Sequence, residues 1–189
     1  MDIHQLPADA VLIGRGKQGA VYKLSSDRCV KVYKKEKHAA KEYRSYCLAE
    51  GSPFIPKIYE HGSNYLVLEY IQGEPLSKAI EKNQTITRIE CEHILNMIHE
   101  MTRLGFTRID TALFHIYIQG DSCKIIDLVN SYHRQYSIPK VMLKGLAKVG
   151  VLQPFLQHIK ELDTDIYKKW TDYIVTRSER YGDLQAFNE

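Results

Sequence analysis

A glycine-rich turn that leads into two short apolar runs constrains the fold of this chain more than any other stretch. The turn has a G-x-G-x-x-G spacing, made by Gly14, Gly16 and Gly19. Apolar runs over residues 21–24 and 29–33 follow it, joined by a polar segment, and this pattern predicts a β-hairpin. Because glycine has no Cβ, such a turn can adopt unusual backbone angles and bring N–H groups close to an anion. The stretch therefore predicts an anion-binding turn at the mouth of a hairpin.

The same glycine spacing occurs in dinucleotide-binding folds, where the glycines lie between a strand and a helix. Here the glycines are followed by one strand and then by a second strand that carries Lys31. A glycine flap over ATP phosphates, with a lysine on the third strand, has this arrangement. The order of elements therefore favours a nucleoside triphosphate site over a dinucleotide site.

The composition is ordinary for a globular protein and disfavours several other classes. The chain has 189 residues, of which 44% are hydrophobic and 26% charged, and its formal net charge of +3 gives no indication of a nucleic-acid partner. No apolar run approaches the roughly 20 residues that span a bilayer, and the N-terminus lacks the pattern of a signal peptide. The four cysteines include no C-x-x-C pair, so we expect reduced, buried thiols in a cytoplasmic protein without a membrane partner.

The first part of the chain is expected to be a small sheet with one helix. The predicted elements after the hairpin are a helix over 36–50, ended by a Gly-Ser-Pro sequence, and strands over 55–59 and 65–70. Residues 71–75 are the best linker candidate. The length allows one or two domains.

After residue 76 the apolar spacing becomes helical. We expect helices over 76–82, 87–104, 139–149 and 154–177, two short strands over 115–118 and 123–126, and a frayed tail over 182–189. Thr87 and Glu90 have the spacing of a capping box. The apolar stripe of the last helix is expected to pack in the core.

Residues 13–130 resemble the protein-kinase-like superfamily, in a compact and divergent serine/threonine-kinase-like version. The resemblance implies an α+β, two-lobed fold. Residues 1–72 would form a small antiparallel-sheet N-lobe with one helix, and residues 73–189 a reduced, mainly helical C-lobe.

The resemblance also implies an ATP site on the N-lobe. The glycine loop would cover the phosphates, Cys29 would line the adenine pocket, and Lys31 would reach the α- and β-phosphates. Glu42 is the candidate partner of Lys31, with Glu36 and Glu50 as alternatives. The residues that would bind the cofactor are Gly14, Gly16, Gly19, Val21, Cys29, Lys31, Glu42, Leu68 and, through their backbones, Glu69 and Ile71.

In the second half, the resemblance places Asp110 as the catalytic base and Asp127 as the ligand of Mg²⁺. His115 stands where the family has a metal-binding asparagine, so it is either a metal ligand or a core or hydrogen-bonding histidine. The chain departs from the family further with Arg-Ile-Asp for His-Arg-Asp and Asp-Leu-Val for Asp-Phe-Gly. No Ala-Pro-Glu follows, and Asn130 could supply an alternative oxygen ligand.

The favoured interpretation is an ATP- and Mg²⁺-dependent phosphotransferase that acts on a hydroxyl group of a protein, of itself or of a small molecule. The alternative is a pseudokinase that binds nucleotide without turnover and acts as a signalling or scaffold module. A third interpretation is a purely structural or interaction protein. Nucleotide titration in the presence of Mg²⁺, followed by an assay for turnover, separates the three.

Overall fold

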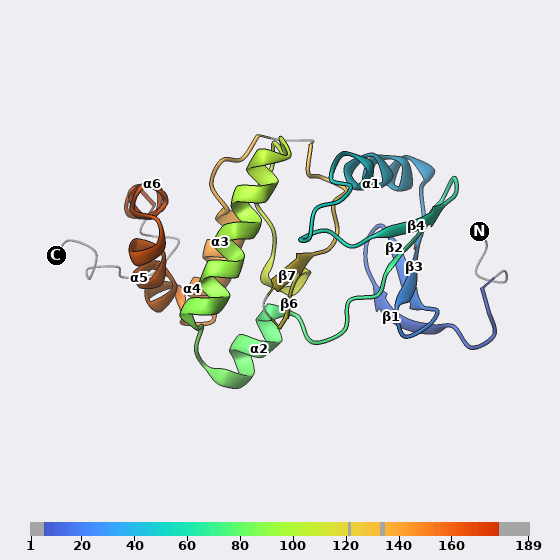
Figure 1. The fold of residues 1–189 in the computed structure, drawn as a ribbon, viewed down its shortest axis with the longest axis horizontal. Helices are drawn as coiled ribbons and strands as arrows, with labels where there is room; N and C mark the ends of the chain where they lie inside the picture. Colours follow the sequence, from blue (N-terminus) through green and yellow to red (C-terminus); the bar gives the residue numbers. More distant parts are fainter. Residues whose placement is uncertain (1–5, 121, 133–134, 178–189) are drawn as a thin grey trace.

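The computed structural model describes residues 6–120, 122–132 and 135–177. A β-sheet with one helix occupies one end of an elongated molecule, and a group of helices occupies the other end (Figure 1). A short two-stranded sheet lies between these two parts. The fold is thus α+β, with a sheet-based N-terminal lobe and a helical C-terminal region, as the resemblance implies.

The N-terminal lobe is a five-stranded antiparallel sheet with the strand order β1-β2-β3-β5-β4. Its strands are β1 (Val11–Arg15), β2 (Gly19–Lys23), β3 (Arg28–Tyr33), β4 (Ile58–His61) and β5 (Tyr65–Glu69). The predicted hairpin is confirmed as β2–β3, in which Val21 pairs with Lys31. The predicted strand over 55–59 begins three residues later than expected. The reason is a turn in which Ile55 N–H donates to the Ser52 carbonyl, followed by Pro56, which has no N–H to give to a ladder.

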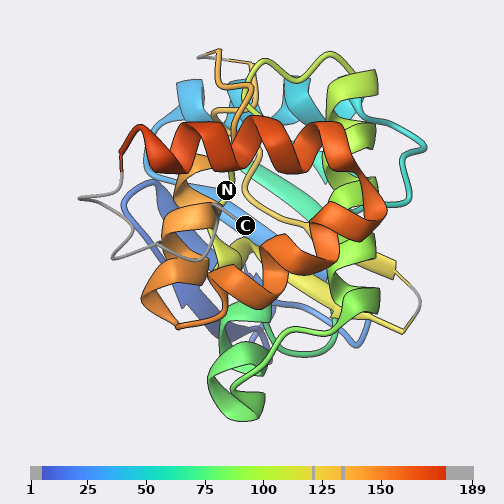
Figure 2. The ribbon, with the colours of Figure 1, turned by 90° about the vertical axis from the view of Figure 1, so that its left-hand side faces the viewer.

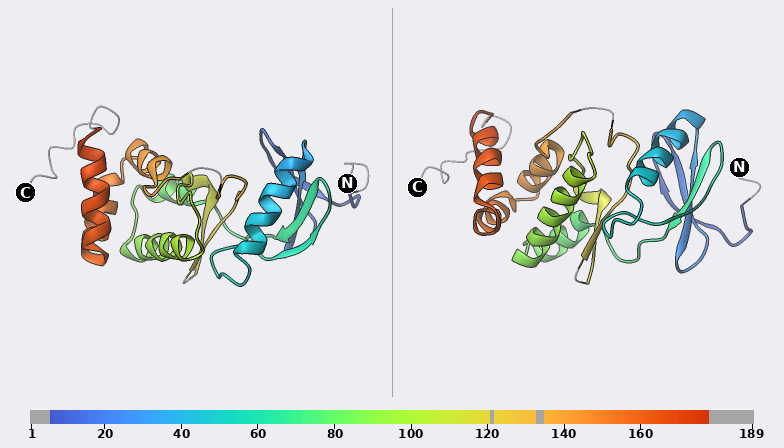
Figure 3. Two further views of the ribbon diagram at one scale, coloured as in Figure 1. Left: turned by 90° about the horizontal axis from the view of Figure 1, so that it is seen from above. Right: turned by 45° about the horizontal axis from the view of Figure 1, so that its top comes forward.

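Helix α1 (Glu36–Leu48) packs against one face of this sheet (Figure 3). Four of its residues are buried on that side: Ala39, Glu42, Ser45 and Tyr46. A small apolar cluster of Tyr22, Val30 and Val67 covers the opposite face of the sheet. Successive side chains of each strand point alternately to these two layers, so residues two apart on a strand share a face of the sheet.

The C-terminal region is helical around a short hairpin, and Figure 2 views the molecule from this helical end. Its elements are α2 (Leu76–Asn83), α3 (Arg88–Arg103), the 3-10 helix η2 (Leu113–His115), β6 (Ile116–Gln119), β7 (Ser122–Ile125), α4 (Lys140–Lys148), α5 (Leu152–Leu162) and α6 (Thr164–Val175). The capping box at the start of α3 is confirmed, with Thr87 and Glu90 exchanging hydrogen bonds. A division of the chain at residues 72 and 73 stays a prediction, and the expected tail over 182–189 lies outside the described residues.

The prediction of one long helix over 154–177 is wrong, because α5 and α6 are separate. Asp163 lies between them in an extended conformation, and its side chain accepts a hydrogen bond from Ile166 N–H at 2.9 Å. Asp163 is therefore the N-cap of α6, and α5 ends before it. The apolar stripe nevertheless packs in the core as expected, with Phe155 and Trp170 stacked at a centroid distance of 6.0 Å.

One apolar core extends from the N-terminal sheet to α6. Three of the four free cysteines are buried, but Cys47 on α1 is exposed, which corrects the expectation of buried thiols throughout. Burial raises the pKa of the Cys29 thiol to about 11, so it is a neutral group on the central strand of the sheet. Within the ranges given above, every helix is too short or too polar to cross a bilayer.

Candidate functional site

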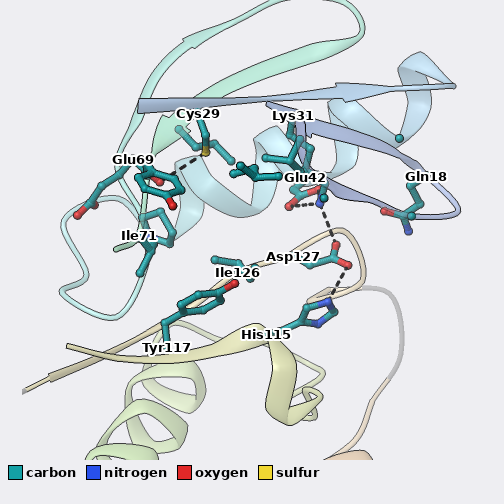
Figure 4. A pocket seen from close by; sticks show the side chains of 18 of the residues that line it. Gln18, Cys29, Lys31, Glu42, Glu69, Ile71, His115, Tyr117, Ile126 and Asp127 are labelled. Atoms are coloured by element: carbon teal, nitrogen blue, oxygen red, sulfur yellow. Dashed lines mark hydrogen bonds and ion pairs between the residues drawn. The ribbon is translucent and has the colours of Figure 1, made fainter. Parts of the chain in front are cut away.

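A cleft of about 600 Å³ lies between the N-terminal sheet and the β6–β7 hairpin (Figure 4). The residues that line it run from Ile13 to Asp127, so the fold assembles this cleft from distant segments. All the predicted cofactor-binding residues and both predicted metal ligands line it: Gly14, Gly16, Gly19, Val21, Cys29, Lys31, Glu42, Leu68, Glu69, Ile71, His115 and Asp127. Asp110 does not line this cleft and is described separately below.

Lys31 forms an ion pair with Glu42, and both residues line the cleft. Lys31 Nζ lies 2.7 Å from Oε2 and 3.0 Å from Oε1 of Glu42, and the Glu42 side chain is completely buried. Of the three candidate glutamates, the structure therefore pairs Glu42 with Lys31. The hydroxyl of Tyr33 donates to Glu42 at 2.7 Å, and Leu128 N–H donates to it at 3.1 Å. These additional donors offset the desolvation of a buried carboxylate and hold it in one position.

Asp127 approaches the same ammonium group from the opposite wall. Its Oδ1 lies 3.2 Å from Lys31 Nζ, so the amine stands between two carboxylates. Burial disfavours the charged ammonium, but Glu42 and Asp127 outweigh it and raise the pKa of Lys31. Asp127 itself has a φ of 66°, a left-handed conformation that is uncommon for a residue with a Cβ. Such a conformation persists only where the surrounding structure enforces it, and it often marks a functional position.

His115 contacts the other oxygen of Asp127, with Nε2 at 3.7 Å from Oδ2. Burial, together with the positive charges of Lys31 and Arg108, lowers the pKa of His115 despite the nearby Asp127. The ring also packs edge-on against Phe114 at a centroid distance of 4.3 Å. An imidazole is a poor ligand for Mg²⁺, whereas a carboxylate combined with nucleotide phosphates suits this ion. Asp127 therefore fits a magnesium site better than His115 does.

The parts of the chain that the structure describes contain no group of three or more His, Cys, Asp or Glu residues arranged to hold a metal ion. A protein-only metal cage is thus not built there. Mg²⁺ sites that rely on substrate phosphates need only one or two protein carboxylates. The carboxylate of Asp127 fits a Mg²⁺ site of this kind, in which substrate phosphates supply the other ligands.

Asp110 lines a smaller pocket of about 110 Å³ that shares His115 and Asp127 with the large cleft. Its Oδ1 accepts hydrogen bonds from Val141 N–H at 2.8 Å and Met142 N–H at 3.4 Å, at the beginning of α4. Pro139, at the N-cap position of α4, forms no side-chain cap, and Asp110 supplies one from a distant loop. Burial raises the pKa of Asp110, although the two N–H groups act in the opposite direction.

Comparison with known proteins supplies one relative of similar length. No protein-family model matches the chain. A curated protein of Bacillus subtilis (strain 168) named "Putative serine/threonine-protein kinase YrzF" is 30% identical over 157 residues, which cover 69% of this chain and 71% of the relative. The chain belongs to this kinase-like family. The sheet-based lobe, the ion pair of Lys31 and the two-walled cleft agree with that relationship.

In this kinase-like chain, β5 and the segment after it form the end of the cleft expected for a nucleobase. Glu69 N–H donates to the Lys57 carbonyl at 2.8 Å, which leaves the Glu69 carbonyl as its backbone group toward the cleft. The thiol of Cys29 lies 3.8 Å from that carbonyl oxygen. The Glu69 side chain turns away and pairs with Lys124 of β7 at 2.9 Å, which ties the two walls together.

The floor of the cleft was not predicted from the sequence. Tyr117 on β6 and Ile126 lie opposite Cys29, so an apolar slot is closed from both sides (Figure 4). Tyr117 is two residues after His115 in the strand predicted over 115–118, and alternation along that predicted strand could have placed it on the same side, although in the structure His115 ends η2 and the strand begins at Ile116. That signal was present in the sequence. The other lining residues that were not predicted are Ile13, Arg15, Lys17, Gln18, Tyr46, Pro56, Tyr70 and Phe114.

Proposed function

We propose that this protein is an ATP-dependent phosphotransferase of the serine/threonine-kinase-like type, which transfers the γ-phosphoryl group of ATP to a hydroxyl. One observation carries the proposal: the Lys31 ammonium is held between Glu42 and Asp127 and faces the cleft beneath the glycine loop. A lysine fixed in this way keeps both its charge and its position for the α- and β-phosphates.

The glycine loop supports the same role. A Cβ at Gly19 would collide with the Val32 carbonyl oxygen, so this hairpin closes tightly only with glycine there. Gly16 has no heavy atom near its Cβ position and faces open space. Its N–H donates to the Gly19 carbonyl at 2.9 Å, which stabilises the turn. The loop can therefore lie over phosphates without a side chain between them.

Asp110 would receive the proton of the acceptor hydroxyl. The hydroxyl oxygen forms a bond to the γ-phosphorus, the bond from that phosphorus to the β–γ bridging oxygen breaks, and ADP leaves. Both hydrogen bonds to α4 use Oδ1 of Asp110, and among the described residues no donor bonds to Oδ2. Asp127, with Asn130 as a second oxygen donor, would hold Mg²⁺, which when bound supplies positive charge at the phosphates.

A specific observation favours the alternative of a nucleotide-binding pseudokinase. One oxygen of Asp110 is committed to α4, and His115 replaces the oxygen ligand that the family has at that position. Both features belong to the group of Asp110, His115 and Asp127, here called the transfer wall. The glycine loop, Lys31 and Glu42, here called the nucleotide wall, all line the cleft. The two candidate functions therefore predict the same binding of nucleotide, and they differ in whether the phosphoryl group is transferred.

Radiolabelled ATP distinguishes the two candidates. Purified protein is incubated with labelled ATP and Mg²⁺, alone and with acceptor mixtures, beside the Asp110→Ala and Lys31→Ala variants. The phosphotransferase predicts label transfer that both substitutions abolish. Magnesium-dependent ATP binding without transfer supports the pseudokinase, and transfer that survives both substitutions contradicts the assigned roles.

A further inference from the structure

The small pocket beside the cleft is lined by a guanidinium group with one buried donor that has no acceptor in the described part of the chain. Arg108 lines this pocket, and its Nε is buried without a hydrogen bond. No carboxylate among the described residues lies within ion-pair distance of Arg108, although its charge acts to lower the pKa of Asp110 from beyond that distance. The guanidinium carbon lies 5.9 Å from the Tyr136 ring. A buried donor without an acceptor is unfavourable, and in native structures it calls for an explanation such as a ligand.

Backbone hydrogen bonds hold the segment that carries Arg108 and the carboxylate of the pocket, Asp110. Arg108 N–H donates to the Ser131 carbonyl at 3.0 Å, and Ile109 N–H donates to the Tyr136 carbonyl at 3.3 Å. Residues two apart on such an extended segment project to the same side and lie about 7 Å apart. Arg108 and Asp110 satisfy this relation, and both line the pocket. The pocket is thus lined by a guanidinium and a carboxylate from one segment of the chain.

The size and position of the pocket limit what can occupy it. A volume of about 110 Å³ holds roughly three or four water molecules, which is enough for the end of a small molecule and too little for a folded peptide segment. His115 and Asp127 are shared with the nucleotide cleft, so a group in the pocket lies next to the phosphates that the cleft would hold. Buried hydroxyl groups of Thr111 and Ser131 complete the polar lining.

We propose that this pocket binds the phosphate acceptor, and that the acceptor is a small hydroxyl compound which carries its own carboxylate or phosphate. Arg108 binds the anionic group, because a guanidinium offers a planar pair of donors that matches either oxyanion. The hydroxyl then points to Asp110, which takes its proton as the oxygen bonds to the γ-phosphorus and ADP leaves. This inference rests on the proposed function and specifies its substrate class.

Binding of three small probes tests the inference on the full chain. Dissociation constants of glycerate, glycerol 3-phosphate and glycerol are measured by calorimetry, with and without Mg²⁺ and a non-hydrolysable ATP analogue. At least one of the two anions is expected to bind about 10- to 100-fold more tightly than glycerol, which lacks the anionic group. The better of the two identifies the anion as a carboxylate or a phosphate.

Two substitutions and a control assign the preference to the guanidinium. Arg108→Gln is expected to reduce the preferred anion to the affinity of glycerol, and Arg108→Lys to retain part of the preference. Arg103→Gln, on the exposed end of α3, is the matched control and keeps the full preference. Thermal unfolding and binding of the ATP analogue verify that each variant is folded. If Arg108→Gln is unfolded, the anion preference of the Arg108→Lys variant tests the role of the guanidinium in its place.

Several results would overturn the inference. These are equal binding of all three probes to the wild-type chain, an anion preference that Arg108→Gln leaves intact, or phosphotransfer to serine peptides with no binding of either anion. Failure of the proposed function is seen separately, because the ATP analogue is titrated in the same experiment. If the chain binds an anion through Arg108 but binds no ATP analogue, the proposed phosphotransferase function is contradicted and the proposal of an anion site at Arg108 still stands.

Discussion

The two walls of the site, which comprises the cleft and the small pocket beside it, differ in how completely their functional groups are assembled. On the nucleotide wall, Glu42 is wholly buried and receives hydrogen bonds from Lys31, Tyr33 and Leu128. On the transfer wall, Asp110 shares one oxygen with α4, and His115 only approaches Asp127, at 3.7 Å. The first wall is part of the core, whereas the second is built from loop ends. Binding of nucleotide is therefore expected to tolerate more change than transfer of the phosphoryl group.

Substitution of Asp127 should have the largest effect. Asp127→Asn removes the charge that would hold Mg²⁺, and we expect phosphotransfer to fall by about 1000-fold or more, since metal stabilisation of the transition state is worth several kcal/mol. Steady-state transfer from labelled ATP measures it. Asp172→Asn, on the exposed side of α6, is the control. An unchanged rate in Asp127→Asn would remove Asp127 from the mechanism.

Substitution of Asp110 separates its contact with α4 from its proposed proton transfer. Asp110→Asn keeps an oxygen for the α4 N–H groups but cannot accept a proton, so the rate should fall by about 100- to 10 000-fold with little change in stability. Asp110→Ala also removes the cap and should lower the free energy of unfolding by about 1 kcal/mol. Kinetics and urea unfolding of both variants measure the two effects. If Asp110→Asn retains the full rate, Asp110 is a structural cap alone.

The nucleotide wall is tested through stability. Lys31→Met leaves Glu42 as a buried carboxylate without its cation, and breaking such a pair should lower the free energy of unfolding by about 3 kcal/mol. Adding Glu42→Gln removes the buried charge and should restore part of the loss. Urea unfolding of the single and double variants measures this coupling. Equal losses in both variants would show that Glu42 does not depend on Lys31.

His115→Asn should have the smallest effect, and it makes the transfer wall more like that of the family. The amide oxygen is a harder ligand than imidazole, so we expect Mg²⁺ to support nucleotide binding at a several-fold lower concentration. A titration of Mg²⁺ at fixed ATP analogue, followed by thermal unfolding, measures the change. A higher requirement for Mg²⁺ would instead assign His115 a direct part in holding the metal or Asp127.

Local patterns placed the residues of the nucleotide wall together at the cleft, but they did not indicate the surroundings of Asp110. Alternation along β3 and the glycine spacing are local, so they placed Lys31 and the loop at the cleft. The contact of Asp110 with Val141 joins residues 31 apart and leaves no periodic signal. The break at Asp163 was missed because the apolar stripe keeps its spacing across a single extended residue. Tyr117 was missed although strand alternation could have indicated it.

Calorimetric titration of the wild-type chain with a non-hydrolysable ATP analogue tests the central claim most directly, which is that a triphosphate binds between Lys31 and Asp127. We predict saturable binding to one site that requires Mg²⁺ and weakens by about tenfold or more in Lys31→Met, because a charge-assisted contact to phosphate is lost. Absence of binding to the folded wild-type chain, or equal affinity in a folded Lys31→Met variant, would contradict the account.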